Sequence, residues 1–501
     1  ERHKTTFRRR VARIVTPGTV TDAEVLTSGR ANYLLAVHES GDSVQLAWAD
    51  VSTGTVHERT VAVDQVAAEV KRIGPVEIIY SADAAKIVDD LLSCTVPRFR
   101  IDTAPGTDNI SEFYPECSDA STRFQCPAAL DLLLGYIRGT ACAAEGAALP
   151  VLALPTAATD RDHMQLSGSV LAALDLTGPA GIINRLCSAT LTGPGQRLLE
   201  QRLLFPSLHV GVIDGRLARA EALVVDAERR RHLRAVLEGV PDFERALQRV
   251  VQAKTAYIVR DLRCLVEGIE AAGRLNIAVP ENVRGIAGLV EAVLAPSADA
   301  SVRLGEQRVV REGRDAVLDE LWAAVDGPAH GDLEAKYREE TGVSDLRIIT
   351  VKGALVVEVP RAAVLSTTET GTKFTVDSHT ATRTRYRTVE LDRVHADRTR
   401  GTERAYEREA EVIGTLIEAV RAAAPALHGL VSAVAEVDVA AATAELAAAH
   451  RYCRPRLYDD TRFSVRDGRH PLVEQLRPAA FVRNSLCLDG ESPQRFALLT
   501  G

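Results

Sequence analysis

The stretch DFERALQRVVQAKTAYIVRDL, residues 242–262, is the best guide to the fold of this chain. Its apolar residues recur at the spacing i, i+4, i+7 and i+8, which lines one face of an α-helix. These residues are Phe243, Leu247, Val250 and Val251. The pattern predicts an amphipathic helix that packs against other helices, so a helical scaffold is the first expectation.

The same periodicity returns far downstream, where apolar residues line one side of a second long helix. These residues are Tyr406, Ile413, Leu416, Ile417 and Val420. We expect Pro425 to end or kink this helix, because proline lacks the backbone N–H. Two helical stretches that are distant in sequence, residues 141–330 and 395–455, are therefore predicted to form one core.

Between these stretches the pattern changes to β, which predicts a β-rich insertion at residues 331–394. Within it Arg383, Arg385 and Arg387 alternate, so all three lie on one face of a strand, and Lys373 lies upstream. This spacing suits contacts with successive DNA phosphates. A solvated edge strand protected by charge has the same pattern, and both interpretations stay open.

Residues 25–140 alternate between strand and helix patterns. NYLLAV (32–37) and VEIIYS (76–81) predict strands, whereas DQVAAEVKRI (64–73) predicts a helix. The alternation indicates a small α/β domain with a mixed or parallel sheet. No G-x-G-x-x-G motif follows its first strands, so we expect no nucleotide site there.

Composition limits the possible functions. A chain of 501 residues suggests several domains, and a formal net charge of −8 restricts nucleic-acid contacts to local patches. The eight cysteines show no C-x-x-C pair or metal-ligand spacing, which indicates reduced cytosolic thiols and no metal site. Neither a run of 18 apolar residues nor a secretory signal is present in the sequence, so no contact with a membrane is expected.

Both ends of the sequence look abrupt. It begins with Glu1 rather than methionine, and RFALLTG (495–501) ends where a buried strand reaches a glycine, so we expect both ends to be cut or processed. Residues 1–13 hold six basic residues against one acidic residue, which suits a nucleic-acid arm or a solvated strand or linker. Pro17 and Gly18 then predict a type II turn with positive φ at Gly18.

Taken in order, these segments resemble the MutS family of DNA mismatch-repair proteins. RRVARIVTPGTVTD (9–22) resembles the exit from the family's mismatch-reading domain, and NYLLAV (32–37) the start of its connector domain. LTGPGQRLLEQRLL (191–204) resembles its core, and RYRTVEL (385–391) the exit from its clamp. The most specific stretch, YCRPRLYDDTRFSVRDGRHPLVEQ (452–475), resembles the opening of the family's ATPase domain.

The resemblance implies a multidomain α and α/β protein: a small α/β connector, a long-helix lever and core domain with an inserted β-rich clamp, and the truncated start of a P-loop ATPase domain. The implied ranges are 1–24 for the tail of the mismatch-recognition domain and a linker, 25–140 for the connector, 141–330 and 395–455 for the core and lever, 331–394 for the clamp, and 456–501 for the edge of the ATPase domain.

The resemblance also implies sites. Lys373, Arg383, Arg385 and Arg387 would contact DNA phosphates from the clamp. Phe481, Asn484 and Gly501 would be remnants of a nucleotide site, with Gly501 matching the first glycine of the phosphate loop. Because the lysine and hydroxyl residue of that loop are not in the sequence, we expect this chain to have no catalytic residue and to bind neither ATP nor Mg²⁺.

The function implied for the intact protein is that of an ATP-dependent mismatch sensor and sliding clamp, and thus of a DNA-dependent ATPase with ATP and Mg²⁺ as cofactors. The implied partners are double-stranded DNA, a second copy or a related subunit in a dimer, and a MutL-type protein on the connector. A cytoplasmic, nucleoid-associated bacterial protein is expected. A MutS homologue that acts in recombination and a helical adaptor that binds only proteins are the alternatives.

Overall fold

The computed structural model describes residues 14–91, 95–102, 106, 108–117, 123–141, 149–157, 159, 162–174, 176, 181–253, 257–298, 301–326, 331–351, 353–366, 372–476 and 481–489. The chain divides into two compact units. The larger unit comprises Glu1–Ala287 and Glu418–Gly501, and the smaller unit comprises Gly288–Ile417.

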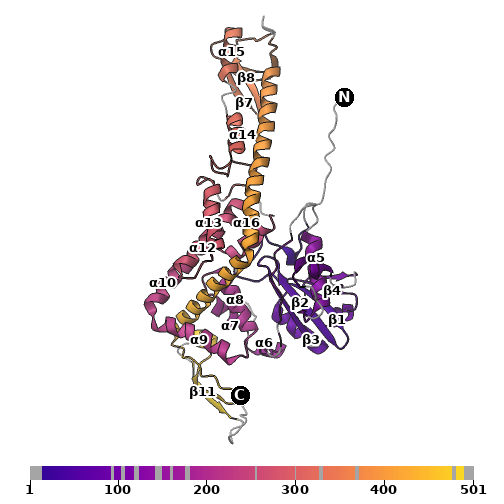
Figure 1. Cartoon of the computed structure of the whole chain (residues 1–501), viewed down its shortest axis with the longest axis vertical. Coiled ribbons are helices and arrows are strands. Elements are labelled where there is room, and N and C mark those ends of the chain that lie inside the picture. Colours follow the sequence, from indigo (N-terminus) through magenta and orange to yellow (C-terminus); the bar gives the residue numbers. More distant parts are fainter. Residues whose placement is uncertain are drawn as a thin grey trace. The chain divides into compact units, whose positions relative to one another are not determined.

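A six-stranded mixed sheet lies in the first part of the larger unit (Figure 1). Its strands are β1 Leu34–Ser40, β2 Ser43–Asp50, β3 Thr55–Ala62, β4 Glu77–Ser81, β5 Arg98–Ile101 and β6 Thr156–Ala157. They lie in the order β5-β4-β1-β2-β3-β6. The strands β1, β2 and β3 pair antiparallel, whereas β4 pairs with β1 and β5 in parallel and β6 pairs with β3 in parallel. The α/β character predicted for this region is confirmed.

Helices cover both faces of this sheet. They are α1 Val66–Ile73, α2 Ala85–Leu91, α3 Asp108–Phe113 and α5 Pro127–Ala141. Leu34 of β1 belongs to an apolar cluster with Leu133 of α5, and Leu35 belongs to a second cluster with Val70 of α1. Successive residues of a strand point to opposite faces, so β1 contributes to both cores.

The turn before the sheet differs from the predicted one. Pro17–Thr19 form a short 3-10 turn, η1, and Gly18 lacks the positive φ of a type II turn. Gly18 instead donates its N–H to Glu77 Oε2 at 2.6 Å, and a Cβ at this position would lie 2.8 Å from the Cβ of Leu34. Close packing, rather than backbone conformation, therefore requires the glycine.

Helices make up most of the remaining larger unit. They are α6 Gly168–Ala173, α7 Ile182–Cys187, α8 Gly193–Leu204, α9 Val210–Val225, α10 Ala227–Leu237, α11 Phe243–Val251 and α12 Ile258–Arg274. The stretch 242–262 thus contributes to two helices, α11 and α12. Its four predicted core residues, Phe243, Leu247, Val250 and Val251, are fully buried on α11.

One helix of 62 residues, α16 Val389–His450, begins in the smaller unit and ends in the larger one (Figure 1). Ile413, Leu416 and Val420 are buried on it, as the periodicity predicts. The helix continues through Pro425 to His450 and does not end at the proline. Beyond it, β11 Phe463–Gly468 and β12 Asn484–Leu488 form an antiparallel pair, with α17 Pro471–Leu476 between them in the chain.

The smaller unit contains the predicted β insertion. Its elements include α14 Ala316–Asp326, α15 Gly331–Thr341, β7 Arg347–Val351, β8 Ala354–Pro360, β9 Thr375–His379 and β10 Arg383–Arg387, and α13 Glu281–Val293 leads into it. The strands form an antiparallel sheet in the order β7-β8-β10-β9. The Tyr337 hydroxyl lies 2.8 Å from Thr388 Oγ1 and donates to Glu390 at 3.0 Å, so the two ends of the insertion lie together.

Candidate functional site

The helix α11 joins the sheet of the larger unit to its helices through polar side chains. Arg245 is buried on α11, and its guanidinium donates to the carbonyl oxygens of Thr27, at 3.0 Å, and of Arg30. Gln248, on the next turn, donates to the Val151 carbonyl at 2.7 Å. One short stretch of helix thus holds two separate backbone segments that flank the sheet.

Buried ion pairs connect α11 to α8. Arg197 of α8 donates to Asp242 at 2.9 and 2.7 Å and to Glu244 at 3.0 and 2.5 Å. Burial opposes the charge on Arg197, but Glu244 and Asp242 outweigh it and raise its pKa. Burial would also raise the pKa of Asp242, but Arg197 holds it below its usual value. Burial dominates at Glu244 and raises its pKa. Removal of one partner would leave an uncompensated buried charge.

The sequence LTGPGQR at the start of α8 explains how the helices approach so closely. Asp438 of α16 is fully buried and accepts hydrogen bonds from Thr192 N at 2.8 Å and Thr192 Oγ1 at 2.7 Å. A Cβ on Gly195 would lie 2.2 Å from Asp438 Oδ2, and one on Gly193 would lie 2.6 Å from Asp242 Oδ2. The two glycines therefore let α8 pack against both α11 and α16.

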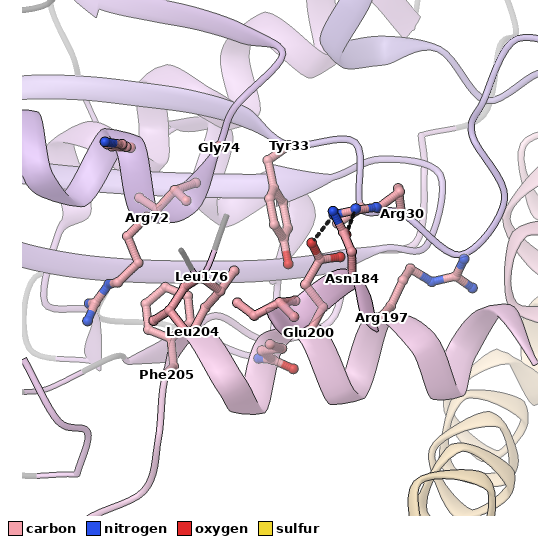
Figure 2. A pocket seen from close by; sticks show the side chains of 15 residues that line it. Arg30, Tyr33, Arg72, Gly74, Leu176, Asn184, Arg197, Glu200, Leu204 and Phe205 are labelled. Carbon is pink, nitrogen blue, oxygen red and sulfur yellow. Dashed lines mark hydrogen bonds and ion pairs between the residues drawn. The ribbon is translucent and has the colours of Figure 1, made fainter. Parts of the chain in front are cut away.

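Two cavities lie beside Arg197 and share Tyr33 as a lining residue. The first, of about 330 Å³, lies between the segment before β1, the end of α1 and the helices α7 and α8 (Figure 2). In Figure 2, Arg30 donates to Glu200 and to Asn184. Burial raises the pKa of Glu200 and of Tyr33 above their ordinary values. The second cavity, of about 420 Å³, lies on the side of His57 and α9.

The contacts of this junction join the sheet to the helices through α11. Among the described residues, no group of three His, Cys, Asp or Glu side chains could hold a metal ion. Movement of the sheet relative to α11 must either break the hydrogen bonds of Arg245 or carry α11 with it. Movement of α11 would in turn strain the ion pairs to α8, because Arg197 of α8 binds both Asp242 and Glu244.

The predicted DNA-contacting arginines lie on β10 of the smaller unit, each with a carboxylate partner. The nitrogen–oxygen distances are 2.7 Å for Arg383 and Asp345, 3.0 Å for Arg385 and Glu358, and 2.7 Å for Arg387 and Asp392. Arg383 and Arg385 expose 24% of their side chains, whereas Arg387 exposes 47%. Arg387 is therefore the most accessible of the three to a DNA backbone.

Lys373 precedes β9 on the exposed surface, and no ion pair joins it to another residue in the described part of the chain. Residues 331–394 contain ten acidic and ten basic residues, so the insertion has no formal net charge. Contacts with DNA phosphates would thus depend on a few exposed cations rather than on the field of the whole insertion.

The predicted nucleotide-site residues belong to the C-terminal hairpin. Phe481 is half-buried just before β12, and Asn484 is exposed at the first position of β12, opposite Gly468. Gly501 lies outside the described residues. The structure thus places Phe481 and Asn484 three positions apart on one segment.

Residue patterns alone missed the polar side of the junction. The apolar periodicity of residues 242–262 identifies one face of α11, whereas Arg245 and Gln248 on the other positions are also buried. The one local signal is Asp242, whose carboxylate accepts the Arg245 N–H at 3.4 Å and caps α11. Its partner Arg197 lies 45 residues away, which no local pattern reveals.

Comparisons with known proteins match this architecture. A family model described as MutS domain III matches residues 169–444, which is more than half of the chain, and one described as MutS domain II matches residues 32–141. In the described part of the chain no helix combines the length and apolar character needed to cross a membrane.

Curated relatives match along almost the whole chain. The DNA mismatch repair protein MutS of Nitrobacter hamburgensis is 29% identical over 552 residues, covering 100% of this chain and 59% of that protein. The protein of the same name from a Ruegeria species is 30% identical over 539 residues, covering 99% of this chain and 60% of that protein. The one from Nitrobacter winogradskyi is 30% identical over 514 residues, covering 94% and 57%. The chain therefore spans about three fifths of the length of these relatives.

Proposed function

The chain belongs to the MutS family, and from this premise we propose that it forms the connector, core and clamp parts of a DNA mismatch-repair protein. One observation carries the proposal. The two family models fall, in order, on the two sides of the buried junction, with MutS domain II on the sheet and MutS domain III on the helices. The names of the three relatives favour mismatch repair over a role in recombination.

The role of the junction follows from its contacts. Arg245 binds backbone carbonyls beside the sheet, Arg197 binds the start of α11, and Asp438 of α16 binds the start of α8. A displacement of the connector would therefore reach α16, the helix that continues into the smaller unit. Such a chain of contacts suits a protein in which a signal at one domain changes the grip of another on DNA.

The proposed DNA contact is made by the insertion through Lys373, Arg383, Arg385 and Arg387. Lys373 and Arg387 supply the exposed positive charges, and phosphate oxygens would compete with Asp392 for Arg387. Contacts of this kind position a duplex without reading its sequence. Their strength should fall steeply with salt, because cations that bind DNA phosphates displace condensed counterions.

For the whole protein we extend the proposal to ATP and Mg²⁺ as cofactors, to a dimer, to a MutL-type partner on the connector, and to a cytoplasmic location near the nucleoid. The support is family membership together with the hairpin after α16, which resembles the opening of the family's ATPase domain.

Fluorescence anisotropy with a short labelled duplex, measured over a series of salt concentrations, tests the DNA contact. We expect the Lys373→Gln/Arg387→Gln variant to bind the duplex more weakly. The slope of log K plotted against log salt concentration should be shallower by about 0.9 for each lost phosphate contact. In Asp392→Asn we expect tighter binding, because Arg387 loses its internal competitor.

The matched control is Lys86→Gln/Arg100→Gln, which removes one exposed lysine and one exposed, ion-paired arginine from the larger unit. This control should bind as the parent does. Equal affinities and slopes for the parent and the Lys373→Gln/Arg387→Gln variant would reject the assignment of DNA contacts to the insertion.

A further inference from the structure

The second cavity beside the junction has features that the proposed repair function does not use. Its volume is about 420 Å³, within the range of small-molecule sites. Its lining comes from the sheet, from the loop that holds His163, and from the helices α8, α9, α11 and α16. All of these parts belong to the larger unit.

Two arginines share one carboxylate beside this cavity. Arg202 of α8 and Arg219 of α9 both pair with Glu436 of α16, the latter at 2.9 Å. Arg216 of α9 lines the cavity and has no ion pair in the described part of the chain. Burial and the like charge of Arg202 lower the pKa of Arg216, although the nearby Glu436 opposes them.

Two further arginines lie near His163, which lines the cavity. Arg59 and Arg72 lie near its ring, and both pair with Glu69, at 3.4 and 2.8 Å. Burial, opposed by the nearby Asp162, lowers the pKa of His163, and these two arginines and Arg216 lower it further. Three carboxylates, those of Asp50, Glu244 and Glu436, also line the cavity, so the place for an added negative charge is local, beside Arg216.

Two buried polar atoms at this cavity have no hydrogen-bond partner among the described residues. They are Arg202 Nε and His163 Nδ1. An arginine Nε can only donate, and a neutral imidazole carries one N–H that can donate. Arg202 Nε is therefore a donor, and His163 Nδ1 is one in the tautomer that carries its proton there. A buried donor normally has an acceptor, because leaving one unpaired is costly.

Aromatic rings make part of the remaining wall. His57 and Phe205 line the cavity and both stack on the Trp48 ring, with centroid separations of 5.3 and 6.0 Å. Arg72 lies 4.2 Å from the centroid of the Phe205 ring. These contacts hold the arginine and the rings in fixed positions, so the cavity is organised before any ligand enters.

We propose that this cavity binds a small phosphate-bearing anion, held by Arg202, Arg216 and His163. A phosphate group offers several acceptor oxygens and negative charge, which matches one unpaired arginine and two unpartnered buried nitrogens. A diphosphate fits within the volume of the cavity. Its occupancy would brace α8 against the sheet, next to Arg197.

Isothermal titration calorimetry of the full chain with sodium pyrophosphate tests the proposal, with inorganic phosphate and citrate as separate titrants. We expect saturable one-to-one binding of pyrophosphate. Arg216→Gln and Arg202→Gln should each weaken the affinity about tenfold or more, because each loses a charge-assisted hydrogen bond. Arg216 has no ion pair to lose, so its variant should keep the parent's melting temperature without ligand.

The matched control is Arg454→Gln. Arg454 also pairs with residues of α9, at 2.7 Å to Glu221, but it does not line this cavity. The Arg454→Gln variant should bind pyrophosphate as the parent does. No binding to the parent, or equal loss in Arg454→Gln, would overturn the proposal, and equally tight citrate binding would overturn the choice of phosphate. DNA affinity is read out separately, so failure here leaves the proposed repair function standing.

Discussion

Substitution of Gly195 by alanine should destabilise the larger unit by about 1.5–6 kcal/mol. The new Cβ would lie 2.2 Å from Asp438 Oδ2 and 2.8 Å from Asp438 Cβ, so the side chain cannot simply rotate away. Overpacking of this kind costs about 1–3 kcal/mol, and a lost hydrogen bond to a charged group about 1.5–3 kcal/mol. Alanine recovers up to about 1 kcal/mol through its higher helix propensity.

Urea unfolding followed by the fluorescence of Trp48 measures this change. The chain has two tryptophans, so a Trp322→Phe background makes Trp48 the only reporter, and it lies in the larger unit. The control is Gly215→Ala in α9, where no atom lies within 4 Å of the new Cβ, and we expect it to stabilise by up to about 1 kcal/mol. If Gly195→Ala is as stable as the parent or more stable, the close packing of α8 on α16 is refuted.

Three further predictions concern buried polar groups. Burial and the nearby His163 lower the pKa of His57 to about 4, so the stability that neutral His57 contributes is present above pH 6.5 and is lost as the pH falls toward 4. In the His57→Phe variant the acid-induced loss of unfolding free energy should be smaller by about 3 kcal/mol, as measured by urea unfolding at several pH values. Tyr337→Phe removes the hydroxyl that bonds Thr388 and Glu390 and should cost the smaller unit about 1–3 kcal/mol, measured by Trp322 fluorescence in a Trp48→Phe background. Arg245→Met should speed hydrogen exchange in residues 27–30, and unchanged exchange would show that Arg245 does not hold this segment.

The elements with a regular apolar period were the predictable part of the fold. One face or both are buried in the strands around Leu34 and Ile78 and in the helix around Leu247. Apolar residues that recur every 2 residues in a strand or every 3.6 residues in a helix identify such a buried face. The change of period at residues 331–394 also revealed the β insertion, whose sheet the structure contains.

The junction could not be predicted, because its partners are distant in sequence. Arg197 and Asp242 are 45 residues apart, and Thr192 and Asp438 are 246 apart. A polar residue on a helix is normally expected to face solvent, and only tertiary contacts make Arg245 or Gln248 a core residue. Gly18 also depends on a distant contact. The Pro17-Gly18 pair suits a turn with positive φ, but close packing against Leu34 is what requires the glycine.

The rate of spontaneous mutation in the host organism tests the central claim most directly. The strains to compare are one that lacks the gene, one in which the gene carries Arg245→Met, and one in which it carries the control Lys86→Gln. The account predicts a mutator phenotype in the deletion strain, a raised mutation rate with Arg245→Met, and the parental rate with Lys86→Gln. A deletion strain that mutates at the parental rate would contradict a role in mismatch repair, and a parental rate with Arg245→Met would contradict the role of the junction.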